Sequence, residues 1–276
     1  MPVSTSTLAP ELSPPQGHIV YTCFLDGFDN ICIMNADGSE QRRLTTTAAT
    51  DFYASLSPDG RTVAISTRRD GDFEIYLMDS DGSHLRRLTE GLGDCFAPDF
   101  SPDGSQIVFV SGREGVQNIW VMSADGARPR QLTTAGNNID PAWSPDGRQI
   151  AFAAYRGGTR ELYVMDRDGA NVRQVTFELN IGGRNDWSPD SRTLTFYAGP
   201  PGARNIYLIS LEDGSLRQLT DSSDNRGPTF SPDGAWIAFT SFRDGNNDIY
   251  AMRPDGSNLR QLTNNPWPEW QPRWGP

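Results

Sequence analysis

Short apolar stretches alternate with polar turns along the whole chain, and no stretch shows the periodicity of an amphipathic helix. In one segment, residues 140–143, 149–153, 161–165 and 172–176 form four such stretches, bounded by Gly, Pro, Asp or Asn. They are rich in β-branched and aromatic residues, which is typical of short β-strands. We refer to the four predicted strands of such a segment as a, b, c and d.

The four-strand segment occurs six times, and its a–b turn is nearly the same each time. The turn reads Ser-Pro-Asp-Gly from Ser57, Ser101, Ser144 and Ser231, and Ser-Pro-Asp-Ser from Ser188, with neighbouring serines 43 or 44 residues apart. A period of about 40–45 residues with four strands in each is the signature of a β-propeller. The sequence therefore predicts an all-β, six-bladed β-propeller with four-stranded antiparallel blades over residues 11–276. A flexible tail, residues 1–10, is predicted to precede it because Ser, Thr and Pro dominate there.

Strand a has one candidate too many for six blades. Residues 10–14 (Pro-Glu-Leu-Ser-Pro) and 272–276 (Pro-Arg-Trp-Gly-Pro) both match the repeat, and only one can complete the first blade. Trp274 fills the repeat position of Trp143 better than Leu12 does. We therefore predict that the C-terminal strand closes the ring, which removes an exposed strand edge from the first blade.

The charge of the chain limits the classes of partner. The formal net charge is −11, and all 24 basic residues are arginine. Nucleic acid and anionic membrane surfaces repel such a chain, so neither is an expected partner. No run of 18 apolar residues predicts a membrane span, and residues 1–17 have neither the basic residue nor the apolar core of a signal peptide. We expect a monomer that is cytoplasmic, or periplasmic or extracellular if an export signal lies outside this sequence.

The sequence contains no recognisable catalytic or metal-binding motif. Three irregularly spaced cysteines do not form a disulfide framework; Cys23 and Cys32 could face each other across a hairpin, but buried thiols are the favoured interpretation. Only two histidines occur, and zinc-ligand spacings, nucleophile motifs and phosphate-binding glycine loops are not found. We therefore predict no catalytic residue, no metal and no cofactor.

The repeat resembles a known family. Residues 143–147 (Trp-Ser-Pro-Asp-Gly), 150–152 (Ile-Ala-Phe), 248–250 (Asp-Ile-Tyr) and 260–263 (Arg-Gln-Leu-Thr) are similar to the WD-like repeats of the TolB β-propeller family. The resemblance extends over about residues 11–276. It implies a propeller that binds partner proteins, as periplasmic TolB binds the peptidoglycan-associated lipoprotein. Similar propellers also accompany prolyl oligopeptidase-like hydrolase domains or form polysaccharide lyases, so the fold alone does not imply one function.

The two faces of the predicted ring differ in regularity. The a–b and c–d turns share one face, the turn face, whereas the d–a and b–c connections share the other, the mouth face, around the channel mouth. The turns hardly vary between repeats, but the d–a loops do, and binding an asymmetric partner requires such variation. These loops contain nine acids, two arginines and several aromatic residues. The candidate partner-binding residues are Phe52, Tyr53, Asp94, Phe96, Asp140, Arg184, Asp186, Arg226, Glu269 and Trp270.

An acidic surface with aromatic anchors suits a cationic or amphipathic peptide. The leading hypothesis is a non-enzymatic propeller that binds a protein or peptide, with a cationic one expected, at the mouth face. One alternative is an enzyme or enzyme fragment, such as a lyase-like propeller with a metal at the channel mouth or the accessory propeller of a hydrolase. Another is a structural or sensory module of a larger chain.

Overall fold

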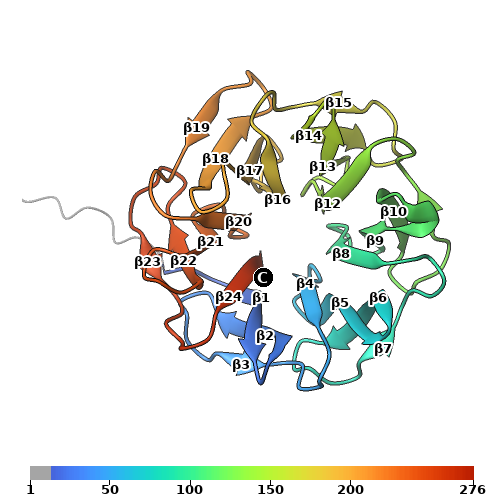
Figure 1. Cartoon of the computed structure of the whole chain (residues 1–276), viewed down its shortest axis with the longest axis horizontal. Helices are drawn as coiled ribbons and strands as arrows, with labels where there is room; N and C mark the ends of the chain where they lie inside the picture. The colour runs from blue at the N-terminus through green and yellow to red at the C-terminus, as the bar shows by residue number, and fades with distance from the viewer. Residues whose placement is uncertain (1–13) are drawn as a thin grey trace, which may run out of the picture.

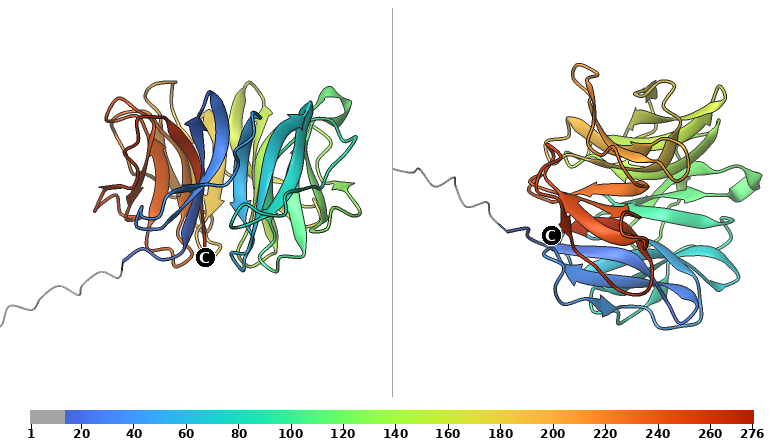
Figure 2. Two further views of the ribbon diagram at one scale, coloured as in Figure 1. Left: turned by 90° about the horizontal axis from the view of Figure 1, so that it is seen from below. Right: turned by 60° about the vertical axis from the view of Figure 1, so that its left-hand side comes forward.

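Six four-stranded antiparallel sheets surround a central channel in the computed structural model, which describes residues 14–276 (Figure 1). The side view shows the blades standing upright around the channel (Figure 2). The predicted six-bladed propeller is thus confirmed. The predicted tail, residues 1–10, and most of the candidate strand at 10–14 lie outside the described residues. Residues 14–276 include no helix with the length and apolar character that a membrane span requires.

Each blade runs from an inner strand beside the channel to a short outer strand at the perimeter. A single 3-10 turn, η1 (Arg113–Gly115), interrupts the strands in the described part of the chain. From inner to outer strand, blade 1 consists of β24 (Glu269–Gly275), β1 (His18–Leu25), β2 (Phe28–Asn35) and β3 (Arg42–Arg43), and blade 2 of β4 (Asp51–Leu56), β5 (Thr62–Asp70), β6 (Asp72–Asp79) and β7 (Arg86–Arg87). Blade 3 consists of β8 (Cys95–Phe100), β9 (Gln106–Ser111), β10 (Asn118–Ser123) and β11 (Arg130–Gln131), and blade 4 of β12 (Asn137–Trp143), β13 (Gln149–Arg156), β14 (Thr159–Asp166) and β15 (Arg173–Gln174). Blade 5 consists of β16 (Ile181–Trp187), β17 (Thr193–Ala198), β18 (Asn205–Ser210) and β19 (Leu216–Gln218), and blade 6 of β20 (Asn225–Phe230), β21 (Ile237–Ser241), β22 (Asp248–Met252) and β23 (Arg260–Gln261).

The C-terminal strand closes the ring, as the repeat register predicts. β24 pairs antiparallel with β1, and Trp274 lies opposite Ile19. The Trp274 side chain is buried, and its indole Nε1 donates a hydrogen bond to the Gln16 carbonyl at 2.9 Å. The first blade is therefore built from both ends of the described chain, and β1 has a paired strand on each side.

The a–b turns repeat because their side chains hydrogen-bond within the turn. In the first of them, Ser57 Oγ donates to Asp59 Oδ1 at 2.6 Å and accepts from the backbone N–H of Thr62 at 2.9 Å. The same two bonds recur in the other four turns. Glycine follows the aspartate because the backbone there has positive φ, +70° at Gly60. Ser191 adopts the same conformation, with φ +59°, without the steric freedom of glycine.

The hydrophobic core lies between neighbouring blades. Phe152 and Tyr163, for example, face Val108 and Val110 of the preceding blade in one buried cluster. Each inner strand also contains a β-bulge, where its register against the next strand shifts. After the bulge, the same repeat position holds Ser55, Asp99, Ala142, Asp186, Thr229 or Arg273. Four of these residues, Ser55, Asp99, Asp186 and Arg273, line the channel at the turn face.

The interpretation of Cys23 and Cys32 as buried thiols is wrong. The two cysteines lie on adjacent strands β1 and β2 and form a disulfide with a Cα–Cα distance of 6.0 Å. Cys23 is opposite Asn30 in the register, so the disulfide crosses the hairpin diagonally. The third cysteine, Cys95, is a buried free thiol, and burial raises its pKa to about 12.

Candidate functional site

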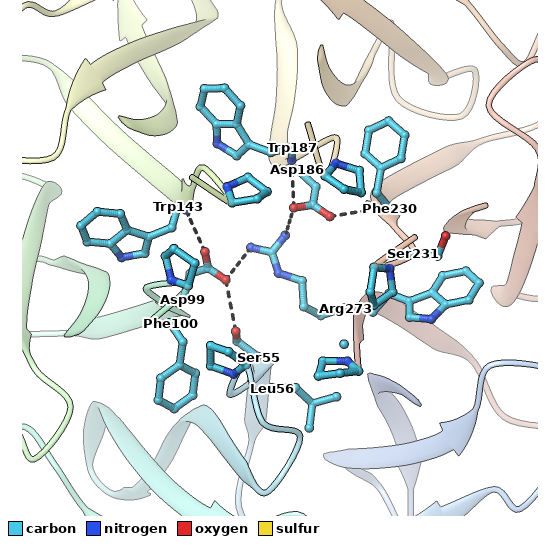
Figure 3. A pocket seen from close by; sticks show the side chains of 18 of the residues that line it. Ser55, Leu56, Asp99, Phe100, Trp143, Asp186, Trp187, Phe230, Ser231 and Arg273 are labelled. Atoms are coloured by element: carbon cyan, nitrogen blue, oxygen red, sulfur yellow. Dashed lines mark hydrogen bonds and ion pairs between the residues drawn. The ribbon is translucent and has the colours of Figure 1, made fainter. Parts of the chain in front are cut away.

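One arginine joins two blades across the channel (Figure 3). Arg273, on the closing strand β24, lies between Asp99 of β8 and Asp186 of β16. Its Nη2 is 2.9 Å from Asp99 Oδ1, and its Nη1 is 3.2 Å from Asp186 Oδ1. Side-chain exposure is only 12% for Arg273, so these ion pairs are largely shielded from solvent.

Both carboxylates also accept hydrogen bonds from neighbouring blades. Asp99 accepts from Ser55 Oγ at 3.1 Å and from the backbone N–H of Trp143 at 2.9 Å. Asp186 accepts from Thr229 Oγ1 at 2.8 Å and from the backbone N–H of Phe230 at 2.9 Å. Asp99 thus binds the inner strand of the next blade, β12, and Asp186 binds the inner strand of the next blade, β20. These bonds couple adjacent blades at the centre of the ring.

The charges in the channel influence one another strongly. Burial raises the pKa of the Asp99 carboxyl, although the Arg273 guanidinium acts in the opposite direction. Burial acts to lower the pKa of Arg273, but the carboxylates of Asp99 and Asp186 outweigh it, and the net shift is upward. Arg273 therefore remains cationic and neutralises part of the charge of the acid pair.

A second arginine crosses the channel nearer the mouth face. Arg184 Nη1 donates to the carbonyls of Gln271 and Pro272, each at 3.4 Å, and its guanidinium lies 5.1 Å from the ring centroid of Tyr53. Asp140 is 8% exposed, and its Oδ1 lacks a hydrogen-bond partner among the described residues. Burial raises the pKa of Asp140, opposed by Arg184. A void of only about 10 Å³ remains between these groups, so side chains fill the channel.

On the mouth side of Arg184 and Asp140 lies a pocket of about 290 Å³, which we call the mouth pocket. It lies between the inner strands β16, β20 and β24. Its charged groups are Arg184 and Arg226, and Trp270 supplies an aromatic surface. The remaining lining residues are Tyr197, Gly227, Thr240, Asn247 and Gln271. The pocket therefore combines two guanidinium groups, an indole and several neutral hydrogen-bonding groups.

Two consecutive glycines in β16 let the residues around this pocket approach one another. A Cβ on Gly182 would lie 1.8 Å from Tyr197 Cε2, and a Cβ on Gly183 would lie 2.5 Å from Asp140 Oδ2. The Tyr197 ring and the Asp140 carboxylate thus occupy space that a side chain on β16 would need. This local sequence explains why the pocket forms beside this blade.

Replacement of Gly182 by alanine should push the Tyr197 ring out of position and lower the free energy of unfolding by about 1–3 kcal/mol, the usual cost of overpacking. Chemical denaturation measures the effect. The matched control is Gly112→Ala, where the added Cβ has only ordinary contacts, the nearest atom being 3.5 Å away, and the expected change is within about 0.5 kcal/mol. Equal stability of the two variants would show that Tyr197 does not depend on this glycine.

The structure brings the predicted site residues together in separate groups. Arg184, Arg226 and Trp270 share the mouth pocket. Phe52, Tyr53 and Phe96 pack on one another, with ring centroids 6.2 Å apart for Phe52–Tyr53 and 5.8 Å for Tyr53–Phe96. Tyr53 connects the two groups through Arg184. These six aromatic and basic residues form a continuous path across the mouth of the channel.

The predicted acids lie mostly apart from that path and make internal contacts. Asp94 accepts from the Phe73 backbone N–H at 2.8 Å, and Glu269 is fully buried with Asn265 Nδ2 2.8 Å away. Asp140 and Asp186 lie inside the channel. Two other d–a loop acids, Asp51 and Asp224, form ion pairs with arginines of the b–c side. The d–a loops therefore present much less free negative charge than their composition indicates.

Sequence reasoning missed several residues of the site. Tyr197, Asn247 and Gln271 line the pocket but lie outside the segments that the loop comparison singled out, or have no charge. The sequence could have identified Arg273 and Asp99, because each directly precedes the aromatic residue of strand a in the repeat register. Six exposed apolar side chains around the mouth face were also missed: Phe24, Phe28, Val116, Tyr155, Phe177 and Phe242.

The donor groups of the channel do not make a metal site. Among residues 14–276, no group of three or more His, Cys, Asp or Glu side chains is arranged to hold a metal ion. The acids of the channel are instead bound by arginine and by backbone and hydroxyl donors. The mouth pocket offers guanidinium, amide and aromatic groups to a ligand.

Six blades, the Ser-Pro-Asp-Gly turns and a channel crossed by ion pairs define a six-bladed β-propeller of the TolB-like class. The profile of the TolB beta propeller domain matches residues 89–276, more than half of the chain, and the chain belongs to this family. Propellers of this family commonly mediate protein interaction. No curated protein sequence matches significantly.

Solved structures support the same fold. TolB from Acinetobacter baumannii is 23% identical, with 96% of this chain and 68% of that chain covered and a TM-score of 0.85. A putative TolB from Agrobacterium tumefaciens is 22% identical, with 95% of this chain and 99% of that chain covered and a TM-score of 0.76. An oligogalacturonate lyase in complex with manganese is 17% identical, with 91% and 75% covered and a TM-score of 0.57. The neighbours thus include an enzyme, and at these identities they show the fold alone.

Proposed function

We propose that the chain is a non-enzymatic propeller that binds a protein or peptide at the mouth face, with the mouth pocket as the anchor. The observation that carries the proposal is the combination of this 290 Å³ pocket with exposed apolar side chains on the same face. Six of the nine large apolar side chains exposed in the described chain lie on this face. Exposed apolar groups around a polar pocket are typical of protein-binding surfaces.

The charge of the pocket favours a carboxylate-bearing segment. Arg226 Nη2 donates to Asn247 Oδ1 at 2.9 Å, and its Nε lies 3.2 Å from Asp224 Oδ2, but the side chain is still 36% exposed in the pocket. Gln271 also lines the pocket, and its Oε1 is buried without a hydrogen-bond partner among the described residues. Arginine binds carboxylates through paired hydrogen bonds, and tryptophan anchors a neighbouring apolar group. The expectation of a cationic partner counted nine loop acids; six of them make the internal contacts described above, and Glu90, Glu178 and Asp221 are exposed.

Selection of binders from a random peptide library against the full chain tests the proposal. We expect enriched peptides with Asp or Glu next to an aromatic residue, and Arg226→Ala or Trp270→Ala should weaken their binding about 30-fold, the effect of losing an interface hot spot. Asp224 keeps Arg204 as its partner in the first variant, at 3.3 Å, so the fold is preserved.

The matched control for these variants is Glu178→Gln, an exposed acid on the same face, which should change affinity less than twofold. Binding that survives both Arg226→Ala and Trp270→Ala would overturn the proposal. The lyase-like alternative has no specific support among the described residues, because their acids are not arranged for a metal.

A further inference from the structure

The turn face contains a second concavity at the opposite end of the channel, a funnel of about 280 Å³ (Figure 3). Asp99, Arg273 and Asp186 form its floor. Six exposed prolines, one from each blade, surround its opening: Pro58, Pro102, Pro145, Pro189, Pro232 and Pro276. One apolar residue of each blade forms the wall behind them: Leu56, Phe100, Trp143, Trp187, Phe230 and Trp274. The funnel is therefore apolar at its walls and charged only at its base.

A groove continues from the funnel across the turn face. It has a volume of about 510 Å³ and shares Pro58, Phe100 and Pro102 with the funnel. Its charged lining residues are Asp59 and Asp103, on the a–b turns of neighbouring blades, and Arg86 of β7. The two spaces together can hold one large side chain in the funnel and a short extended segment in the groove.

The turns of the turn face contain more acids than arginines. The eleven a–b and c–d turns contain thirteen acids and six arginines. All five a–b turn aspartates are exposed: Asp59, Asp103, Asp146, Asp190 and Asp233. In the described chain, every arginine–carboxylate ion pair lies in the channel or on the mouth side, and the turn face has only the pair His84–Asp79. The turn face therefore attracts cations.

The turn aspartates remain ionised over a wide range of pH. Hydrogen bonds from Ser101, together with those from Ser105, lower the pKa of Asp103 to about 2. The hydrogen bond from Ser57 likewise lowers the pKa of Asp59. The negative charge beside the groove is therefore permanent at any pH near neutrality.

We propose that the funnel and its groove are a second docking surface, which binds a basic peptide segment of a partner protein. An apolar, preferably aromatic, side chain of the segment fills the funnel, and Lys or Arg side chains lie beside Asp59 and Asp103. A second copy of this chain is a poor occupant, because it carries the same acidic face and a net charge of −11. Residues 1–13 are also a poor occupant of this acidic surface, because they contain Glu11 and no basic side chain.

Calorimetric titration of the full chain with defined peptides tests the proposal. The probe is the blocked peptide Arg-Arg-Trp-Arg-Arg, compared with versions that have Ala for Trp or Glu for every Arg. We expect binding of the first peptide, weakened by added salt, and at least tenfold weaker binding of the other two. The variant Asp59→Asn/Asp103→Asn keeps the turn hydrogen bonds and should bind about tenfold more weakly, from two exposed ion pairs of somewhat under 1 kcal/mol each.

The matched control is Asp213→Asn, which removes one exposed turn charge away from the funnel and should change affinity less than twofold. Equal affinity for the basic and acidic peptides, or an unchanged affinity of the double variant, would overturn the proposal. So would a loss of binding in Arg226→Ala, because it would assign the peptide to the mouth pocket. Tighter binding after removal of residues 1–13, or a dimer that the double variant dissociates, would identify a different occupant and also overturn it.

Discussion

Removal of residues 267–276 should abolish cooperative unfolding of the propeller. The deletion removes β24, so β1 loses its inner partner and the first blade retains only three strands. It also removes buried Trp274, whose packing is worth about 3–5 kcal/mol, and leaves Asp99 and Asp186 without their cation, at a similar cost. The sum is comparable to the whole stability of a typical domain, about 5–15 kcal/mol.

Thermal unfolding followed by circular dichroism and calorimetry measures this effect. The control is removal of residues 1–11, which should leave the melting temperature nearly unchanged, since β24 already occupies the fourth strand position of the first blade. If the N-terminal deletion abolished the transition and the C-terminal one did not, ring closure by β24 would be refuted.

The fold was predictable because its determinants are local and repeated. Each of the five a–b turns fixes its own geometry through bonds within six residues, as at Ser57, so these turns at one spacing, together with the closing strand, specify six blades. The closing strand was predictable for the same reason, since Trp274 matches Trp143 in the register. The diagonal disulfide Cys23–Cys32 was not, because a pair offset by two residues across a hairpin has no periodic signal.

The site was predictable only in part, because it depends on contacts between blades. The loop comparison selected Arg184, Arg226 and Trp270, and the structure places these three residues in one pocket. The loop comparison counted the acids of the d–a loops but left out the arginines of the b–c connections, which lie on the same face. Arg69 pairs with Asp51 there, and Arg204 pairs with Asp224. Which side chains neutralise one another depends on distances that the repeat register does not encode.

The two faces use the same scaffold for different chemistry. On the mouth face, the symmetry between blades is broken, acids are paired with arginines, and the open pocket carries guanidinium groups. On the turn face, the repeat itself creates a ring of prolines and unpaired aspartates around the funnel. The regular turns are structural, and their repetition also generates a symmetric surface with a chemistry of its own.

Replacement of Arg273 by methionine should lower the free energy of unfolding by about 3–5 kcal/mol at pH 7, the cost of leaving a buried charge unpaired. Methionine preserves much of the side-chain volume, so the loss reports mainly on charge. Asp99 and Asp186 would then face each other in the channel without a cation, and like charges at short range raise carboxyl pKa values further. Urea unfolding at several pH values measures the effect.

The dependence on pH separates this charge effect from a packing defect. A carboxyl whose folded pKa lies above its unfolded value binds a proton on folding, so its stabilisation is present below the unfolded pKa, near 4, and is lost as pH rises through the folded pKa. Burial already raises the pKa of Asp99 in the intact chain. The deficit of Arg273→Met should therefore shrink as the pH is lowered from 7 toward 4.

Two further variants decide the interpretation. Asp99→Asn/Asp186→Asn/Arg273→Met removes all three charges and should recover much of the lost stability, because a neutral channel has no uncompensated ion. Arg173→Met, on an exposed outer strand, should change stability by less than about 0.5 kcal/mol. A deficit in Arg273→Met that is below 1 kcal/mol, or that stays constant with pH, would show that Arg273 does not hold the ring together through its charge.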